Sequence, residues 1–359
     1  MSTFTLAPLS SRLLRRLPGA RTLETFATES TVVCGAEDRA MHPAVFPAGE
    51  LDRVTGVHPF SAGMEDELHL TTRDQVHHTE TIAWRLRNVY LVNGMLCNHR
   101  GYERLTYRNL PFQPARVETI EQTSAFCSSA PGNDYFAHFL LDDAATALLG
   151  KEFGQVTFAR TPQPRTAHML DYLRYFEVPY KEARPTKFRD LWVFTDHPQN
   201  SHRRERMQHF RTLLRKKFGD LQNPAPAYIR RGRSGIGIPR ILENETEIET
   251  LLARRGFRIV DPETMSADEL CRQLINSPLI VGVEGSHLAH GVLNLQPGGA
   301  LLCIQPAAHF NAVFRGYCNT LDLRWGFVVA AGQTNRFRQS TKRLLNTIDQ
   351  LLEQANTSC

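Results

Sequence analysis

The chain contains no apolar run as long as the ~18 residues that predict a membrane-spanning helix. Its first stretch, MSTFTLAPLSSRLLRRLPGAR, has arginines but lacks an apolar core of signal-peptide length. We therefore predict neither a transmembrane helix nor a secretory signal, and expect a cytoplasmic protein.

The cysteines exclude a disulfide framework. They are seven, an odd number, they are widely spaced, and no CxxC pair occurs. Disulfide-rich domains and thiolate zinc sites need paired or closely spaced cysteines, so neither is expected. Cys303 lies inside an apolar run and is predicted to pack as a small hydrophobic side chain. The positions are Cys34, Cys97, Cys127, Cys271, Cys303, Cys318 and Cys359.

Signals of nucleic-acid binding are also lacking, because there is no RNP-like aromatic motif, zinc finger or long basic tract. The 42 basic and 37 acidic side chains leave a net charge of +5. Such a mild excess suits anionic small ligands and does not require a nucleic acid.

The length of 359 residues predicts two domains. In the first, placed at 1–196 with an irregular N-terminal region, strand and helix patterns alternate, which predicts a parallel, doubly wound sheet. Asn93-Gly94 predicts the turn of a hairpin. The segments are a hairpin near 82–98, a helix at 133–149 capped by Asn133 or Asp134, a strand at 155–160, a helix at 166–176 and a strand at 191–196.

Residues 197–226 are predicted to connect the domains through a basic helix and the linker NPAPA. The second domain, 227–335, is predicted to be Rossmann-like. The residues after it, 336–359, are expected to form a helix that packs back toward the first domain. The five predicted strands of the second domain are AYIRR, FRIVDP, LIVGV, ALLCIQ and FVVAAG.

The most informative segment is VGVEGSHLAHG at 281–291, where a strand breaks at a glycine-containing turn and a helical pattern begins. The first N–H groups of a helix lack partners and carry positive potential, which suits a phosphate. Gly285, Ser286 and His287 are therefore candidate phosphate ligands, and a purely structural turn is the alternative. His287 and His290 have no third metal ligand near them in sequence.

The second domain resembles glycosyltransferase family 61. The resemblance is carried by YIRR at 228–231, Arg240 with the following Asn244-Glu245, RGFRIVDPE at 255–263 and the segment 281–291. Glu284-Gly285-Ser286 looks more like the bacterial branch, which makes capsular and exopolysaccharides. The resemblance implies a GT-B fold, with two Rossmann-like domains facing an interdomain cleft. It also implies an inverting transfer from a nucleotide-sugar, most often UDP-linked, with no obligatory metal and no separate cofactor.

Transfer without a metal needs cations that neutralise the leaving diphosphate. Arg231 and Arg240 are the candidates, joined by the glycine-rich link GRSGIGIP. Arg230 and Arg233 compete for the role, and exposed arginines without a ligand are the alternative.

The remaining candidates each have two interpretations. Asn244 and Glu245 are either caps of a helix or ligand contacts. Glu284 either holds a hydroxyl group or acts as a base. The family also has an aromatic-rich His segment with an acid on the same helix, matched here by DYFAHFLLDD. His138 and Asp142 are thus the first-domain candidates for the base.

The predicted function is therefore a cytoplasmic glycosyltransferase acting on a glycan or lipid-linked glycan, with a possible peripheral membrane contact through the basic helix at 202–217. A solvated helix face is the alternative for that helix. A non-catalytic scaffold of the same fold and an NAD-dependent sugar-modifying enzyme are the rival functions. The glycines at 232, 235 and 237 do not match GxGxxG, which disfavours NAD.

Overall fold

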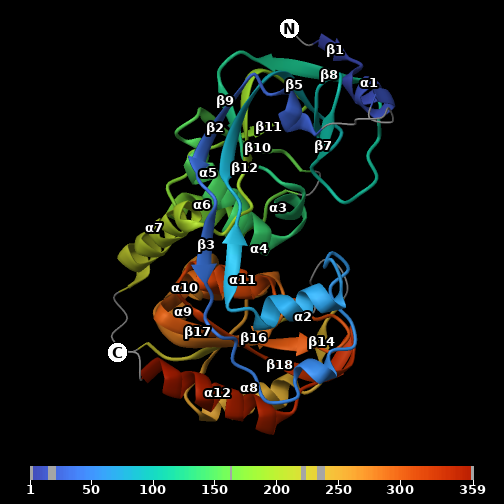
Figure 1. Ribbon diagram of the computed structural model, residues 1–359. Helices are drawn as coiled ribbons and strands as arrows, with labels where there is room; N and C mark the ends of the chain where they lie inside the picture. Colours follow the sequence, from blue (N-terminus) through green and yellow to red (C-terminus); the bar gives the residue numbers. More distant parts are fainter. Residues whose placement is uncertain (1–2, 15–21, 162–163, 220–223, 233–238, 357–359) are drawn as a thin grey trace. The chain divides into compact units, whose positions relative to one another are not determined.

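The computed structural model describes residues 3–14, 22–161, 164–219, 224–232 and 239–356. The chain divides into two compact units, 1–37 with 79–206, and 38–78 with 207–359. Each unit has a sheet and a hydrophobic core of its own. The structure is thus of mixed α/β class, with several sheets and helices (Figure 1). The predicted domain bounds remain a prediction.

The first unit is built on a ten-stranded sheet in the described part of the chain. Its core is formed by side chains such as Leu86, Phe126 and Phe188. The strands are β1 Thr3–Thr5, β2 Glu29–Cys34, β5 Thr81–Val92, β6 Met95–Cys97, β7 Tyr102–Arg104, β8 Ala115–Ile120, β9 Ser124–Phe126, β10 Gln155–Ala159, β11 Lys181–Ala183 and β12 Thr186–Thr195. The helical segments are α1 Ala7–Leu14, η1 Leu23–Phe26, α3 Ala130–Asp134, α4 Phe136–His138, the π-helical turn η3 Phe139–Asp143, α5 Ala144–Gly150 and α6 Ala167–Tyr175.

This sheet is mixed, so the prediction of a parallel sheet for the first unit is wrong. Strands β9, β10 and β11 are parallel, as alternating strands and helices require. The longest strand pair, β5 with β12, is antiparallel, and β5 continues into the antiparallel hairpin with β6. That hairpin is confirmed: Asn93 and Gly94 both have positive φ, at 53° and 74°, as a tight two-residue turn requires.

The helix predicted at 133–149 is interrupted. Pro131 lies in the first turn of α3, whose N-cap is Ser129, so Asn133 and Asp134 are not the caps. Tyr135 is extended, with φ −132° and ψ 129°, and separates α3 from α4. The π-helical turn then follows, with His138 just before it and Asp142 within it. Neither break has a signal in the apolar periodicity, because the apolar residues keep their spacing through both.

The second unit contains a seven-stranded sheet in the order β14-β19-β18-β17-β16-β13-β15. All five strands predicted for this domain are present, and they pair in parallel. The strands are β13 Ala227–Ile229, β14 Ile241–Leu242, β15 Arg258–Val260, β16 Ser277–Val283, β17 Leu295–Pro306, β18 Arg324–Gln333 and β19 Arg336–Arg338. The helices are η2 Leu51–Arg53, α2 Met64–Thr72, α8 Glu245–Arg254, α9 Ala267–Leu274, η4 Ser286–Leu288, α10 Ala289–Asn294, α11 Val313–Thr320 and α12 Thr341–Asn356.

Helices cover both faces of this sheet, which is parallel except for the antiparallel pair of β18 and β19 (Figure 1). On one face, Leu252 of α8 and Ile348 of α12 pack with Leu279, Val281 and Val283 of β16 in one core. Helices α10 and α11 lie on the other face. Burial on both sides explains why the strand at 279–283 is apolar at successive positions. Helix α12 thus has its partner inside its own unit, whereas a position against the first domain was expected.

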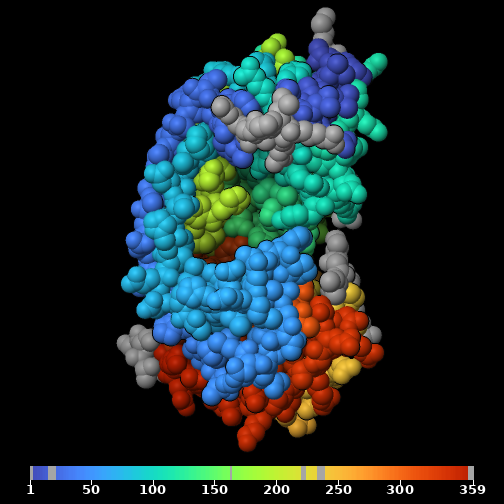
Figure 2. Space-filling model, turned by 45° about the vertical axis from the view of Figure 1, so that its right-hand side comes forward, coloured from blue at the N-terminus to red at the C-terminus, as the bar shows by residue number. Residues whose placement is uncertain are grey.

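Residues 38–78 pack on the C-terminal part of the second unit (Figure 2). Val45 exchanges backbone hydrogen bonds with β18: its N–H donates to Trp325 at 3.0 Å, and Phe327 donates to its carbonyl at 3.0 Å. Glu50 is fully buried, accepts from the N–H of Val329 at 2.5 Å and forms an ion pair with Arg343. The segment also contains the two-stranded sheet of β3 Glu37–Ala40 and β4 Gln75–His78. No pattern in the sequence of 38–78 predicted this packing.

The basic helix is α7, Ser201–Phe218. Arg203 and Arg211 are 1% exposed, and each donates to backbone carbonyls of its own unit. They therefore cannot form the charged, solvent-facing surface that contact with a membrane through this helix needs. The apolar face of α7 is buried through Met207, Phe210, Leu214 and Phe218.

Candidate functional site

The topology of the second unit marks one place on its sheet for a ligand. Strand β15 lies on one side of β13, and β16, the next strand in the chain after β15, lies on the other side of β13. Neighbouring connections therefore diverge at the carboxyl ends of β13 and β16, and open α/β sheets bind ligands at such a point. Arg231 follows β13, and Glu284 to His287 follow β16. Five sequence-predicted candidates thus lie at this switch point.

Arg231 lies over the turn at Gly285. Its guanidinium is 3.1 Å from Nδ1 of His287. Gly285 has φ 153° and ψ 169°, a backbone conformation that is essentially restricted to glycine. A Cβ at this position would collide with the Arg231 guanidinium. The glycine therefore serves both the turn and the placement of the arginine.

His287 is held neutral by its surroundings. Burial, and then the positive charges of Arg231 and Arg240, lower the pKa of His287 well below its usual range. If Nδ1 accepts from Arg231, the ring proton is on Nε2. Nε2 is buried and has no hydrogen-bond partner among the residues that the structure describes.

Arg240 and Glu284 form a buried ion pair, and Arg240 also donates to the carbonyl of Glu284 at 3.1 Å. Glu284 is only 4% exposed. Because the carboxylate is neutralised by Arg240, the two side chains form one unit rather than two separate groups. Arg231, in contrast, makes no ion pair within the described ranges.

His309 lies near Arg231 and Arg240, and no sequence pattern had identified it as a candidate site residue. Burial, then the charges of Arg240, His58 and Arg231, lower the pKa of His309 to about 4. The rings of His58 and His309 are 4.8 Å apart, centroid to centroid. His309 follows the carboxyl end of β17 by three residues, at the edge where ligands bind, and this position was the available signal.

Asn244 and Glu245 have structural partners. The Asn244 amide donates to the Gln339 carbonyl at 2.9 Å and accepts from the Gln339 N–H at 3.1 Å, and it makes no side-chain cap. Glu245 accepts from the Tyr228 hydroxyl at 2.9 Å and from the N–H of Arg231 at 3.1 Å. Glu245 therefore helps to hold the backbone of Arg231 in place. Ser286 begins the 3-10 turn η4 and is partly exposed, and the link at 233–238 lies outside the described residues.

The competitor Arg230 is bound elsewhere. Its guanidinium forms a bidentate pair with Glu249 at 2.6 and 2.8 Å and a further pair with Asp261 at 2.9 Å. Two carboxylates already neutralise it, so Arg230 is a weaker candidate for a diphosphate than Arg231. Arg233, the other competitor, is outside the described residues.

In the first unit, His138 and Asp142 are joined directly. Nδ1 of His138 lies 2.7 Å from Oδ2 of Asp142. Burial lowers the pKa of His138, but the hydrogen bond and charge of Asp142 outweigh it, and the net pKa is raised. The side chains are 31% and 21% exposed, so solvent reaches this pair.

Arg203 positions Asp142 and was not singled out in the sequence. Its guanidinium donates to Oδ1 of Asp142 at 3.1 Å and to the Leu141 carbonyl at 3.0 Å. Behind it lies Asp196, which makes a bidentate pair with Arg206 at 2.7 and 2.8 Å. Burial opposes ionisation of Asp196, yet the arginines lower its pKa to about 2. The pair of His138 and Asp142 therefore rests on a charged network.

A parallel α/β unit with cationic side chains at the carboxyl edge of its sheet is the architecture of a protein that binds phosphorylated ligands. Residues 136–302 match the family model Glycosyltransferase 61. This match supports glycosyltransferase family 61, and the family suggests glycosyltransferase activity with a sugar donor and a glycan acceptor. The mixed α/β structure is compatible with such an enzyme. No curated protein matches the chain.

Two further properties concern the part of the chain that the structure describes. No helix there combines the length and the apolar character needed to cross a membrane. No group of three or more His, Cys, Asp or Glu side chains there is arranged to hold a metal ion.

Proposed function

We propose that this protein is an inverting, metal-independent glycosyltransferase. It transfers a hexosyl or pentosyl group from a UDP-linked nucleotide-sugar to a capsular polysaccharide, an exopolysaccharide or a related glycan. The observation that carries the proposal is Arg231, a cation that makes no ion pair with any residue the structure describes, placed over Gly285 at the switch point between parallel strands.

The donor half of the reaction needs positive charge on the leaving diphosphate. Arg231 would supply one direct contact. Arg240 would supply a second if the diphosphate shares it with Glu284, and the carboxylate could then receive a sugar or ribose hydroxyl. The backbone at Gly285, Ser286 and His287 offers further donors. Because these groups belong to the chain itself, the proposal requires neither a metal nor a separate cofactor.

The acceptor half needs a base near the operating pH. His138 has this property, since its pKa is raised above the ordinary histidine value. Its hydrogen bond to Asp142 leaves Nε2 as the atom that would take the acceptor proton, and Asp142 would stabilise the imidazolium that forms. Glu284 is the weaker candidate because Arg240 neutralises it. A GT-B arrangement would bring both halves to one cleft, and we expect the enzyme in the cytoplasm or at the inner face of the plasma membrane.

The test is calorimetric titration with UDP, GDP and ADP in the presence of a chelator. We expect one of them to bind, and the Arg231→Ala variant to bind it more weakly by roughly 1.5–3 kcal/mol, the cost of a lost charge-assisted contact. Binding that requires a divalent metal would overturn the metal-independent part. Lack of nucleotide binding with and without metal would overturn the proposed function.

A further inference from the structure

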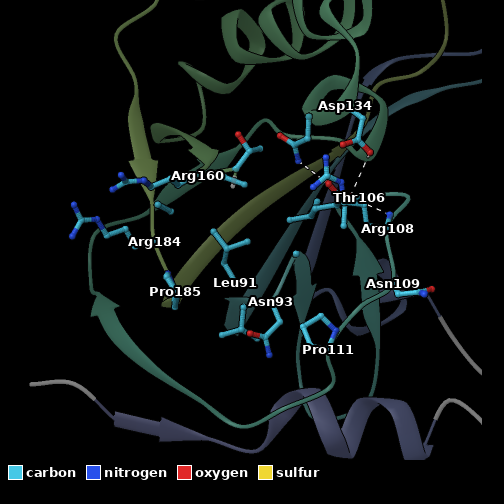
Figure 3. Close-up of a pocket in the computed structure, with 17 residues that line it drawn as sticks. Leu91, Asn93, Thr106, Arg108, Asn109, Pro111, Asp134, Arg160, Arg184 and Pro185 are labelled. Carbon is cyan, nitrogen blue, oxygen red and sulfur yellow. Dashed lines mark hydrogen bonds between the residues drawn. The ribbon is translucent and has the colours of Figure 1, made fainter. Parts of the chain in front are cut away.

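The first unit contains a pocket. None of the candidate catalytic or phosphate-binding residues described above lines it; of the residues discussed earlier, Asn93, Gly94, Asn133 and Asp134 do. Its volume is ≈ 810 Å³, within the range of sites that bind small molecules. The walls come from the ends of β5, β10 and β11, from the loop after β7 and from α3. Asn93, Thr106, Asn109 and Asp134 give it polar groups, and Leu91, Pro111 and Pro185 give it apolar surface (Figure 3).

Two arginines lie side by side at this pocket. Strands β10 and β11 are parallel, and Ala159 pairs with Ala183 at their last residues. Arg160 and Arg184 follow directly, and the N–H of Arg160 donates to the Ala183 carbonyl at 2.9 Å. Equivalent positions on paired strands face the same side, about 5 Å apart. Figure 3 shows both side chains at one rim of the pocket, extending in the same direction and away from the other labelled residues.

These like charges have no counter-ion in the described part of the chain. Neither Arg160 nor Arg184 makes an ion pair there, and a third lining arginine, Arg108, also makes none with its guanidinium. The one acidic group of the lining, Asp134, accepts from the N–H of Tyr107 at 3.1 Å. Three unpaired guanidinium groups around a polar pocket favour an anionic ligand.

We propose that this pocket binds the acceptor, and that the acceptor is a saccharide carrying a carboxylate or phosphate. Arg160 and Arg184 hold the anionic group, the amides and Thr106 hold hydroxyl groups, and the apolar wall receives C–H faces of the sugar. The identification of the ligand as acceptor rests on the proposed function, whereas the anion preference rests on the pocket alone.

The experiment measures binding of three probes to the full chain: a glucuronate-containing disaccharide, glucose 1-phosphate and an uncharged disaccharide. We expect at least one anionic probe to bind about tenfold or more tightly than the neutral one, and the double variant Arg160→Gln/Arg184→Gln to lose that preference. Lys181→Gln is the control, because it removes a charge from the other end of β11. Which anion binds best distinguishes carboxylate from phosphate.

The proposal is overturned if no anionic probe binds, or if the double variant binds as tightly as the unchanged protein. Titration of the same samples with UDP separates this result from the proposed function. If saccharide binding is absent and UDP binding is intact, only the proposal for the pocket is overturned. If saccharide binds and no nucleotide binds, only the proposed transferase function is overturned.

A different observation, at the N-terminus, carries a second inference. Nine large hydrophobic side chains of the described residues are exposed, and five of them lie between residues 4 and 14. Helix α1 buries Ala7 and Ser11, both 0% exposed, and leaves its leucines outside. This reverses the usual arrangement of a surface helix. The five are Phe4, Leu6, Leu9, Leu13 and Leu14, at 66, 54, 38, 64 and 43% exposure.

The charge of residues 1–23 indicates which kind of partner covers the exposed hydrophobic side chains. The sequence has arginines at 12, 15, 16 and 21 and no acidic residue before Glu24. Exposed leucines and phenylalanine next to arginines without acids match an anionic bilayer surface. We propose that residues 3–14 dock on the surface of a membrane that contains anionic lipid, independently of any catalytic activity.

The test is co-sedimentation with vesicles of phosphatidylcholine alone and with phosphatidylglycerol added. We expect binding only to the anionic vesicles, and its loss in Leu9→Ser/Leu13→Ser. Leu170→Ser, which changes an exposed leucine on α6, should bind as the unchanged protein does. Absence of binding to anionic vesicles overturns the inference. So does a dimer in light scattering that becomes monomeric in the double variant without any vesicle binding, because a second copy would then be the occupant.

Discussion

Replacing Gly285 by alanine tests the donor site most directly. The residue has φ 153° and ψ 169°, and its missing side chain leaves the space that the Arg231 guanidinium occupies. Alanine therefore introduces two separate costs. The backbone strain of a non-glycine residue in this region is about 1–3 kcal/mol and lowers the free energy of unfolding. The collision displaces Arg231.

The two costs appear in different measurements. Loss of one charge-assisted contact of about 1.5–3 kcal/mol would weaken nucleoside diphosphate binding roughly 10- to 150-fold. Urea unfolding measures the first cost, and calorimetric titration of the folded variant measures the second. In the double variant with Arg231→Ala, the effects on binding should not add, since both changes remove the same contact.

Gly256→Ala is the matched control. Gly256 has φ +83° in the same unit, and a Cβ there would meet nothing within 4 Å. In the Gly256→Ala variant, the free energy of unfolding should fall by about 1 kcal/mol and the affinity for the nucleotide should stay unchanged. The reasoning is refuted if Gly285→Ala is destabilised and still binds with unchanged affinity, because the position of Arg231 would then not matter for binding.

Three further outcomes are expected. Asp142→Asn should abolish turnover at unchanged nucleotide affinity and lower the pKa of His138 in an NMR titration. Because the pKa of His138 is raised in the folded protein, protonated His138 stabilises the fold below about pH 6.5. This contribution is lost as the pH rises through the folded-state pKa. The pKa of His309, lowered to about 4, makes unfolding easier as the pH falls from about 6.5 toward 4, and urea titrations of His309→Gln should lose this slope. Arg203→Met should reduce the free energy of unfolding by about 3–5 kcal/mol, because it leaves buried carboxylates with fewer partners, whereas Lys216→Met on the exposed side of α7 should change it by less than about 0.5 kcal/mol.

The second unit was predictable because its signals are local. Each strand is a short apolar run, each is followed by a helical pattern, and Ser266 with Glu269 forms the capping box that their spacing predicts. In parallel order these elements leave few possible topologies, so Arg231 and the turn at Gly285 could be assigned to one sheet edge in advance.

The mixed sheet of the first unit was not predictable in the same way. The pattern of β12 is the same whether its neighbour runs parallel or antiparallel, and its actual partner β5 begins more than a hundred residues earlier. The break at Tyr135 and the π-helical turn also leave the apolar spacing unchanged, so a continuous helix was the natural expectation.

The sequence by itself determined the α/β class, the five parallel strands and the glycine-containing turn, because periodicity and backbone preference act between residues near one another in the chain. Tertiary structure alone decided that Arg240 neutralises Glu284, that Arg203 is buried behind Asp142 and that Glu50 binds the backbone of Val329, 279 residues away. The physical reason is that an ion pair or a buried charge depends on which side chains meet after folding, and charged side chains give no periodic signal of their partners.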